Sequence, residues 1–469
     1  MTKRTRNIIF GILLIFFLIV APLTVFYSLG WRFDWQSMKP VQTGIFYFKA
    51  WPKNSNIYIN NELRDKTDIF FGSVLVDYLM PDKYDIKVTK EGYHDWQKTL
   101  VIEKKKVTEA KNITLIPNDV NLQPLIENVE EFFISPDNGS IVIKQENTVD
   151  KKTTWSLKLY ELNNNLKSQI ADEKDFSTKG VDLFDVTFSP DSERILLKLG
   201  LKENIQYYLL DIKKSPVTIT KLDFLDSPEK IFFHPKDNNK LLILQETKEN
   251  KKTITTLNEV DISNKEILPP IVKDIVTCSL TDNNIYFLNN LGSVSRSDLS
   301  GEKIEKLNII AFPYKEETDY EIIVSGSSIF LRENKLLYLF DEDTKSFKKL
   351  FDSLEDYQFS PDRNKLTYYS NNEIKVLFLE KQYDQPEKEK HEELFVTRFS
   401  EEINNVFWYT SHYLIFDLNN IIKVIELDNR DKMNTVDLAD FNHEEMFFSN
   451  KKLYLLSEGT LYSSDQLTQ

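Results

Sequence analysis

The sequence predicts an all-β protein in which about three quarters of the chain forms a β-propeller, and two observations support this prediction. First, a phenylalanine followed by a Pro-Asp or Pro-Lys turn occurs four times, in Phe133–Asp137, Phe188–Asp191, Phe233–Lys236 and Phe359–Asp362. Second, a short apolar strand lies on each side of every one of these turns. Self-similarity with a period near forty residues and four strands per repeat is typical of a propeller.

The spacing of the turn prolines favours eight copies of the repeat. Pro136 and Pro190 lie 54 residues apart, and Pro190 and Pro235 lie 45 apart. Pro235 and Pro361 lie 126 apart, which is three periods of 42, so two copies without the turn are expected between them. Strand pairs without the turn occur at 275–288, 320–331, 406–416 and 446–456. Residues 118–469 number 352, which gives 44 residues per blade for eight blades and about 50 for seven, so seven blades stay possible.

The turns resemble the WD-like repeats of periplasmic Tol-type proteins, whose turn reads Phe-Ser-Pro-Asp-Gly. The resemblance covers residues 119–469, but the glycine after aspartate is kept only as Asn138-Gly139. Several strands are continuous apolar runs, as expected for strands buried on both faces. A large sandwich or a β-solenoid is the alternative fold.

The last copy leaves room for only three strands before the sequence ends. A ring with a missing outer strand keeps an open edge. The segment Val120–Ile126 has strand character and precedes the first blade. We therefore expect it to pair as the outermost strand of the last blade, where Pro124 is tolerated because an edge strand need not donate there.

A candidate membrane segment lies at Ile8–Leu29, within the predicted span 8–30. It has 22 residues without a charge, enough for about 33 Å of helix. Lys3 and its basic neighbours in 1–7 predict a cytoplasmic start, with the bulk of the chain outside the cell membrane after a single span. Trp31, Phe33 and Trp35 then suit the outer interface. A cleavable signal peptide is the alternative, but the apolar run is longer than the usual signal core.

Residues 43–117 predict a small antiparallel β domain. Several strands alternate apolar and polar residues, and Pro52, Gly92 and Pro117 interrupt them. The stretch resembles the PEGA domain, a small β-sandwich of prokaryotic surface proteins, through 57–60, 79–84 and 88–93, followed by Trp96. The resemblance implies an extracytoplasmic spacer or adhesion module without catalytic residues. Trp96 is expected in the core, and 104–106 at a hairpin tip.

The sequence predicts no catalytic residue, no cofactor and no metal site. It contains no Gly-x-Ser-x-Gly elbow, phosphate-binding loop or His-Glu-x-x-His motif. Cys278 is the one cysteine and is expected to be a buried thiol. His234 replaces a turn serine and is expected to be structural, and Asp341–Asp343 lacks the glycine of a calcium loop. The net charge of −14 argues against nucleic acid as a partner.

We therefore expect a membrane-anchored, extracytoplasmic binding or scaffold protein of a bacterial cell envelope, and not an enzyme. Its propeller would bind an envelope protein or a cell-wall or surface glycan through its end faces. The alternative is a propeller lyase or glycosidase with carboxylates at the channel mouth. A carboxylate pair about 5–10 Å apart in an axial pocket would favour the enzyme.

Overall fold

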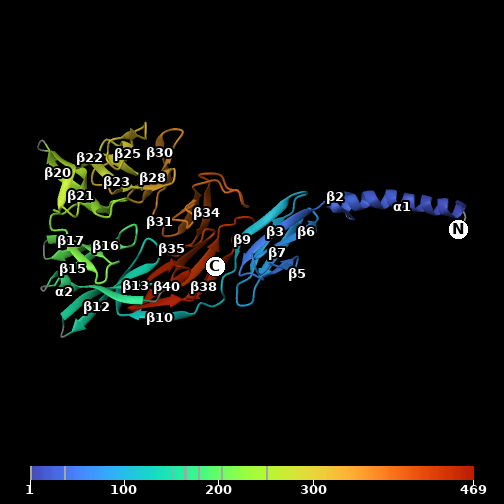
Figure 1. Ribbon diagram of the computed structural model, residues 1–469, viewed down its shortest axis with the longest axis horizontal. Coiled ribbons are helices and arrows are strands. Elements are labelled where there is room, and N and C mark those ends of the chain that lie inside the picture. The colour runs from blue at the N-terminus through green and yellow to red at the C-terminus, as the bar shows by residue number, and fades with distance from the viewer. Residues whose placement is uncertain are drawn as a thin grey trace.

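The computed structural model describes residues 3–35, 38–149, 152–162, 166–177, 180–201, 204–249 and 252–468. Within these ranges the chain is all-β apart from the long helix α1 (Lys3–Ser28) and one short helix, α2 (Glu173–Phe176). Figure 1 shows α1 leading into a small β domain, with the larger β region on its far side. The predicted all-β class with an N-terminal helix is confirmed.

Helix α1 is long and apolar enough to cross a bilayer, and none of its described side chains is buried in the protein. A two-stranded hairpin follows it, and the sequence did not lead us to expect these strands. They are β1 (Trp31–Asp34) and β2 (Lys39–Gln42), paired antiparallel.

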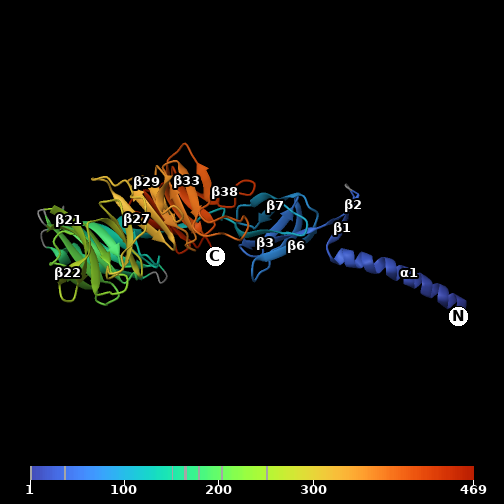
Figure 2. The same ribbon diagram turned by 90° about the horizontal axis from the view of Figure 1, so that it is seen from above.

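The small β domain consists of two sheets that pack around one core. Its strands are β3 (Gly44–Trp51), β4 (Asn56–Ile59), β5 (Glu62–Lys66), β6 (Ser73–Leu79), β7 (Lys83–Thr89), β8 (Trp96–Val101) and β9 (Val107–Thr114). The sheet orders are β6-β3-β9 and β5-β4-β7-β8, and the inward side chains of both sheets form one apolar cluster that includes Trp96. Figure 2 shows this domain between α1 and the propeller.

Two expectations for the small domain are wrong. Strand β9 pairs with β3 in parallel, so the domain is not purely antiparallel. The segment 104–106 connects β8 in one sheet to β9 in the other and is therefore not a hairpin tip. Alternation of apolar and polar residues marks a half-buried strand, but it does not reveal the strand's partner or direction.

The rest of the described chain forms eight four-stranded sheets, here called blades 1 to 8. Blade 1 contains β11 (Val129–Ile134), β12 (Ser140–Val149), β13 (Lys152–Glu161) and β14 (Leu166–Asp172). Blade 2 contains β15 (Asp182–Phe188), β16 (Arg194–Leu201), β17 (Asn204–Asp211) and β18 (Thr218–Lys221). Blade 3 contains β19 (Lys230–Phe233), β20 (Lys240–Glu249), β21 (Lys252–Asp261) and β22 (Glu266–Lys273). Blade 4 contains β23 (Ile275–Leu280), β24 (Asn284–Asn289), β25 (Val294–Asp298) and β26 (Glu305–Lys306).

The remaining blades follow the same order. Blade 5 contains β27 (Tyr320–Ser325), β28 (Ser328–Glu333), β29 (Leu336–Asp341) and β30 (Ser346–Phe351). Blade 6 contains β31 (Asp356–Phe359), β32 (Lys365–Tyr369), β33 (Glu373–Phe378) and β34 (Glu393–Arg398). Blade 7 contains β35 (Ile403–Thr410), β36 (Tyr413–Leu418), β37 (Ile421–Glu426) and β38 (Thr435–Asp440). Blade 8 contains β39 (Glu445–Ser449), β40 (Lys452–Ser457), β41 (Thr460–Ser464) and β10 (Leu122–Glu127).

The eight blades close into a ring. Each junction between consecutive blades holds an apolar cluster built from both neighbours. A further cluster joins blade 8 to blade 1 through Ile126, Phe132, Phe447 and Leu461. Eight sheets with eight shared cores make a closed propeller, so the seven-bladed alternative is wrong.

The ring is latched by the segment Val120–Ile126, which was expected to complete the last blade. Strand β10 pairs antiparallel with β41, from Leu122 opposite Ser464 to Glu127 opposite Thr460. The register shifts just after Pro124, where the strand has a bulge. Residues from opposite ends of the propeller sequence thus complete one sheet, as expected.

The Pro-Asp turns are built alike. In three of them the serine hydroxyl donates a hydrogen bond to the aspartate two positions later, for example Ser135 Oγ to Asp137 Oδ1 at 2.6 Å. The residue after aspartate has a positive φ of 56°, 58° and 59° at Asn138, Ser192 and Arg363. A positive φ favours glycine, which is the residue that the repeat pattern Phe-Ser-Pro-Asp-Gly has after its aspartate.

Candidate functional site

The two faces of the propeller differ, and strand direction defines them. The first strand of each blade lines the axis, because an axial cavity of about 440 Å³ is bounded by residues of β15, β19, β23 and β27. Each blade has four strands, so the chain returns to the same face before the next blade begins. We call the face where the inner strands begin the mouth face, and the opposite face, which carries the Pro-Asp turns, the turn face.

The small β domain contacts the turn face below blades 6 and 7. At the centre of this contact, Lys98 Nζ on β8 lies 2.6 Å from Glu426 Oε1 at the end of β37, and the side chains are 0% and 3% exposed. The indole N–H of Trp96 donates to Glu426 Oε2 at 2.7 Å. The Asn434 backbone and side-chain N–H groups donate to Glu426 Oε1. With the Tyr413 hydroxyl, which donates to Oε2 at 3.5 Å, this carboxylate collects five donors from two domains.

Further hydrogen bonds hold the same contact. Lys98 Nζ also donates to the carbonyl oxygens of Asp428 and Lys432, each at 2.7 Å. The Thr99 N–H donates to Asp431 Oδ2 at 2.9 Å. Burial raises the pKa of Glu426, and the ammonium of Lys98 opposes that rise. The polar groups around Glu426 are paired with one another, whereas Nε2 of His94, buried in the same contact, has no hydrogen-bond partner among the described residues.

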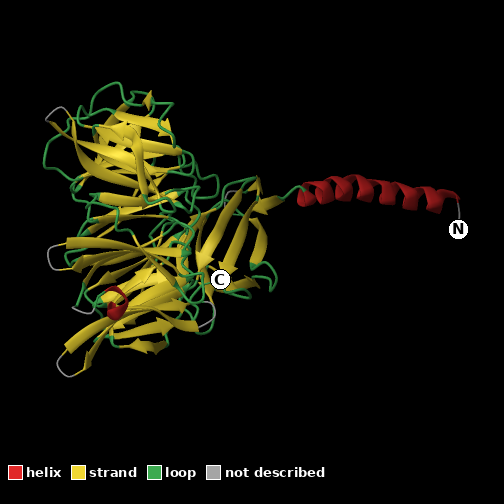
Figure 3. Ribbon diagram, turned by 60° about the vertical axis from the view of Figure 1, so that its left-hand side comes forward, coloured by secondary structure: helices red, strands yellow, loops and turns green. Residues whose placement is uncertain are grey.

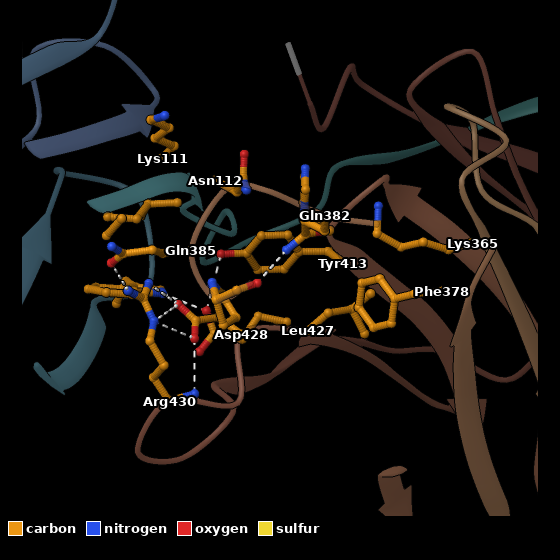
Figure 4. A pocket seen from close by; sticks show the side chains of 16 residues that line it. Lys111, Asn112, Lys365, Phe378, Gln382, Gln385, Tyr413, Leu427, Asp428 and Arg430 are labelled. Atoms are coloured by element: carbon orange, nitrogen blue, oxygen red, sulfur yellow. Dashed lines mark hydrogen bonds and ion pairs between the residues drawn. The ribbon is translucent and has the colours of Figure 1, made fainter. Parts of the chain in front are cut away.

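Strand β9 makes a second row of contacts with loops of blades 6 and 7. The Glu109 N–H donates to Gln385 Oε1 at 3.0 Å, and Arg430 donates to the Glu109 carbonyl at 2.8 Å. Lys111 pairs with Asp384 at 3.0 Å. Figure 4 shows Lys111, Gln385 and Arg430 beside a cavity of about 30 Å³, large enough for about one water molecule. The cavity is a packing gap in an interface and is too small to bind a substrate.

The mouth face carries carboxylates on every blade, and some of them are paired with basic side chains, as Glu130 is with Lys144 at 2.8 Å. Each inner strand has a carboxylate among its first three residues or in the two residues before it. These residues are Glu130, Glu131, Asp182, Glu229, Asp274, Asp319, Glu321, Glu355, Asp356, Glu401, Glu402, Glu444 and Glu445. Because all inner strands begin on this face, the carboxylates from eight blades surround one opening.

Carboxylates of neighbouring blades are close enough to influence one another. Burial raises the pKa of Glu445 in blade 8, and Glu131 in blade 1 adds to the rise. Burial also raises the pKa of Asp356 in blade 6, and Glu321 in blade 5 adds to that rise. These residues touch water, but the channel wall surrounds them and weakens their hydration.

Glu321 has fixed partners. It accepts a hydrogen bond from Tyr357 Oη at 2.8 Å, and Arg332 lies 3.6 Å from its other oxygen. Glu321 also lines the axial cavity. Glu321 and Asp356 are carboxyl groups on the inner strands of adjacent blades, β27 and β31. A carboxyl pair about 5–10 Å apart in an axial pocket is what the enzyme alternative requires.

Long hairpins in blades 1 and 3 rise above the mouth face. Val129 opens β11 opposite Gln145, and Lys230 opens β19 opposite Leu244, so β12 and β20 each continue four or five residues past the inner strand. At 3.3 Å per residue this is about 15 Å. Figure 1 places β12, β20 and β21 at the end of the molecule opposite α1, and Figure 3 shows α1 extending from the other side of the strands. The hairpins wall one side of the acidic opening.

The cysteine, two histidines and the Asp341 turn have the following surroundings in the described chain. Cys278 lies on the inner strand β23, and burial raises its pKa to about 12, so the thiol stays protonated. His234 Nδ1 accepts the N–H groups of Lys236 and Asp237 within its turn. His412 lies at the domain interface, where burial lowers its pKa to about 4. Asp341 caps its own turn and pairs with Lys348. Among the described residues no His, Cys, Asp and Glu side chains gather into a metal-binding group.

Neither a protein-family model nor a curated protein matches the sequence. Solved structures resemble it weakly. Hsv2 of Kluyveromyces lactis has 12% identity and a TM-score of 0.40, covering 67% of this chain and 100% of its own. The WD40 domain of SCAP from fission yeast has 11% identity and a TM-score of 0.40, covering 74% and 98%. An oligogalacturonate lyase in complex with manganese has 13% identity and a TM-score of 0.40, covering 75% and 94%. Likeness at this level adds nothing to the strand topology, which by itself defines the fold.

Proposed function

We propose that this chain is a membrane-anchored binding protein of a bacterial cell envelope that presents the mouth face of its propeller to a partner. One observation carries the proposal. The small β domain, which follows α1, occupies the turn face, so the acidic mouth face is open and directed away from α1. Loops on a rigid scaffold are the usual location of binding residues.

The membrane orientation follows from the flanks of α1. Lys3, Arg4 and Arg6 precede the apolar run, and basic flanks stay on the cytoplasmic side. Both β domains then lie outside the cell, where a PEGA-like spacer would hold the propeller above the membrane. Protease added to intact spheroplasts should degrade the propeller while a cytoplasmic marker survives, and full protection of the propeller would reverse this topology.

The charge of the mouth face favours one kind of partner. A ring of carboxylates repels anionic polymers such as acidic glycans and attracts basic surfaces. We therefore propose a protein with a basic contact surface as the ligand, and a neutral glycan as the weaker candidate. This charge complementarity should make binding weaker at high ionic strength.

Site-specific photo-crosslinking tests the proposal. A photoreactive residue replaces Phe184, which is 57% exposed on the inner strand of blade 2. The matched control is Leu166, which is 58% exposed at the turn-face end of β14. We expect a specific product from position 184, lost at high salt and in a Glu131→Gln, Glu445→Gln variant. Identical products from both positions, or products insensitive to the two charge changes, would contradict a binding mouth.

The second candidate function is a propeller lyase or glycosidase, and the Asp356–Glu321 pair favours it. Asp356, whose pKa burial raises, would donate a proton, and Glu321, held by Tyr357 and Arg332, would act as base or nucleophile. The assay is depolymerisation of a panel of neutral and acidic polysaccharides. Activity abolished by Asp356→Asn and retained by Asp437→Asn, a change on the outer strand β38, would establish this alternative.

A further inference from the structure

The junction between α1 and the small β domain contains a cation held between two aromatic rings. The guanidinium carbon of Arg32 on β1 lies 3.5 Å from the ring centre of Tyr27, near the end of α1, and 4.2 Å from that of Tyr78 on β6. The two rings are nearly parallel, with centres 6.2 Å apart. Arg32 is therefore placed between the last turn of α1 and an edge strand of the small domain.

Arg32 also caps the end of α1. Its Nη1 donates to the carbonyl oxygen of Tyr27 at 2.9 Å, and the same carbonyl accepts the Gly30 N–H at 3.1 Å. A positive charge at this end also complements the helix dipole. The Thr43 N–H and hydroxyl both donate to the Gly30 carbonyl, at 2.9 and 2.8 Å, and close the same junction from the link between β2 and β3.

The backbone of β6 is distorted at the residue that supplies the second ring. Tyr78 has φ +58°, which is unfavourable for a bulky residue. The pairing of β3 with β6 shifts register here, from Phe46 opposite Val76 to Gly44 opposite Leu79. Such a bulge redirects a side chain, and the unfavourable φ persists only where surrounding contacts hold it. The bulge directs Tyr78 toward Arg32.

Apolar side chains of the same junction are exposed on the protein surface. Phe33, Trp35 and Met38 are 43%, 78% and 65% exposed. Phe33 and Trp35 contact each other edge to face, with ring centres 4.9 Å apart. Aromatic side chains that follow a membrane span at this distance match the headgroup layer of a bilayer. The continuity of β1 with α1 identifies the lipid surface as the occupant of this patch.

We propose that the hairpin β1–β2 lies in the outer headgroup layer of the membrane, with Phe33 and Trp35 among the lipids. We propose further that the Tyr27–Arg32–Tyr78 stack locks the small β domain to the end of α1. This inference rests on the proposed membrane anchoring. With the paired interface at Glu426, the lock sets the angle at which the propeller stands above the membrane, so the mouth face has a fixed direction.

Lipid quenching tests the first part with the full chain in nanodiscs. Brominated phosphatidylcholine quenches tryptophan at the depth of the bromine. The chain has six tryptophans, of which Trp31 and Trp35 lie at the junction, so Trp35→Phe should remove about half of the quenchable fluorescence. Trp51→Phe, at the far end of β3, should remove none. Nanodisc-bound protein with equal quenching in wild type and Trp35→Phe would overturn the lipid contact. Failure to enter nanodiscs would overturn the anchoring itself, and co-elution distinguishes the two failures.

Trypsin release tests the second part. Cleavage after Arg32 requires the stack to open, and it yields a new N-terminus at Phe33 that mass spectrometry detects. Tyr78→Asn removes the ring but keeps a residue that tolerates positive φ, and it should speed this cleavage about fivefold. Tyr78→Phe keeps the ring and should cleave at the wild-type rate. Equal rates in Tyr78→Asn and Tyr78→Phe would overturn the lock.

Discussion

Removal of the Glu426 carboxylate should loosen the small β domain from the propeller. Glu426→Ala leaves the Lys98 ammonium buried without its counter-charge and leaves the indole N–H of Trp96 without an acceptor. Loss of one partner of a buried ion pair costs about 3–5 kcal/mol. An orphaned buried donor costs about 1–3 kcal/mol more. Lys98 retains two carbonyl partners, so each of the two costs should lie near the lower end of its range. The expected loss in the free energy of unfolding is therefore about 4 kcal/mol.

A graded series of variants separates charge from packing. Glu426→Gln keeps one acceptor oxygen and should cost less than Glu426→Ala. The double change Lys98→Met with Glu426→Leu replaces the pair by apolar groups and should lie near wild type or above it, because desolvation of both charges is avoided. Asp437→Ala breaks an exposed pair with Lys423 and should cost less than about 1 kcal/mol.

The assay is urea unfolding of the full chain in detergent micelles, followed by tryptophan fluorescence, because Trp96 lies within the interface. The single and double variants form a cycle whose coupling energy isolates the pair. An unfolding midpoint for Glu426→Ala equal to that of Asp437→Ala would refute the reasoning. Two separated transitions in Glu426→Ala alone would show that the interface couples two folding units.

The pH dependence of this interface has a definite sign. Burial raises the pKa of Glu426 above its ordinary value of 4.5, and Lys98 opposes the rise. A carboxyl with a raised folded pKa contributes its stability fully below the unfolded pKa and loses it as pH rises through the folded value. Acidification from neutral pH toward pH 5 should therefore leave the interface intact, and dissociation in that range would contradict the sign.

Three further predictions concern the propeller. Ile126→Ala on the latch strand should lower the free energy of unfolding in urea by about 2–4 kcal/mol, because Ile126 is buried between blades 8 and 1. Gln123→Ala, at an exposed position of the same strand, should cost little, and equal effects of the two changes would argue against a closed ring. Acidification from pH 7 to pH 5 should raise the melting temperature, because the contribution of Asp356 to stability falls as pH rises above 3.8 when its folded pKa is raised. Asp356→Asn should make this rise smaller, and an unchanged rise would contradict the raised pKa. Arg363→Gly should stabilise the propeller by up to about 1 kcal/mol in calorimetry, because φ is +59° there, and a loss above 1 kcal/mol would show that the side chain outweighs the backbone strain.

Local chemistry allowed much of the propeller to be predicted. A Pro-Asp turn depends on proline's fixed φ and on a hydrogen bond between residues two positions apart, so Ser135 and Asp137 are sufficient to mark one blade. Three Pro-Asp turns and one Pro-Lys turn, with spacings that fit a period near forty residues, and the length of 118–469 together predicted the blade count. The latch was predictable too, because a blade with three strands requires a fourth from elsewhere. The apolar run of α1 is equally a property of adjacent residues.

The site depended on contacts that sequence order does not reveal. Lys98 and Glu426 are 328 positions apart, and only the docking of the two domains makes them one buried pair. The acidic residues before each inner strand were visible in the sequence, but their gathering at one opening depends on eight strands beginning on the same face. Likewise, the parallel pairing of β3 with β9 and the bulge at Tyr78 follow from long-range packing. By itself the sequence determined turns, strand runs, the repeat and the membrane helix, because these depend on near neighbours; tertiary structure decided the exposed face and the direction in which it points.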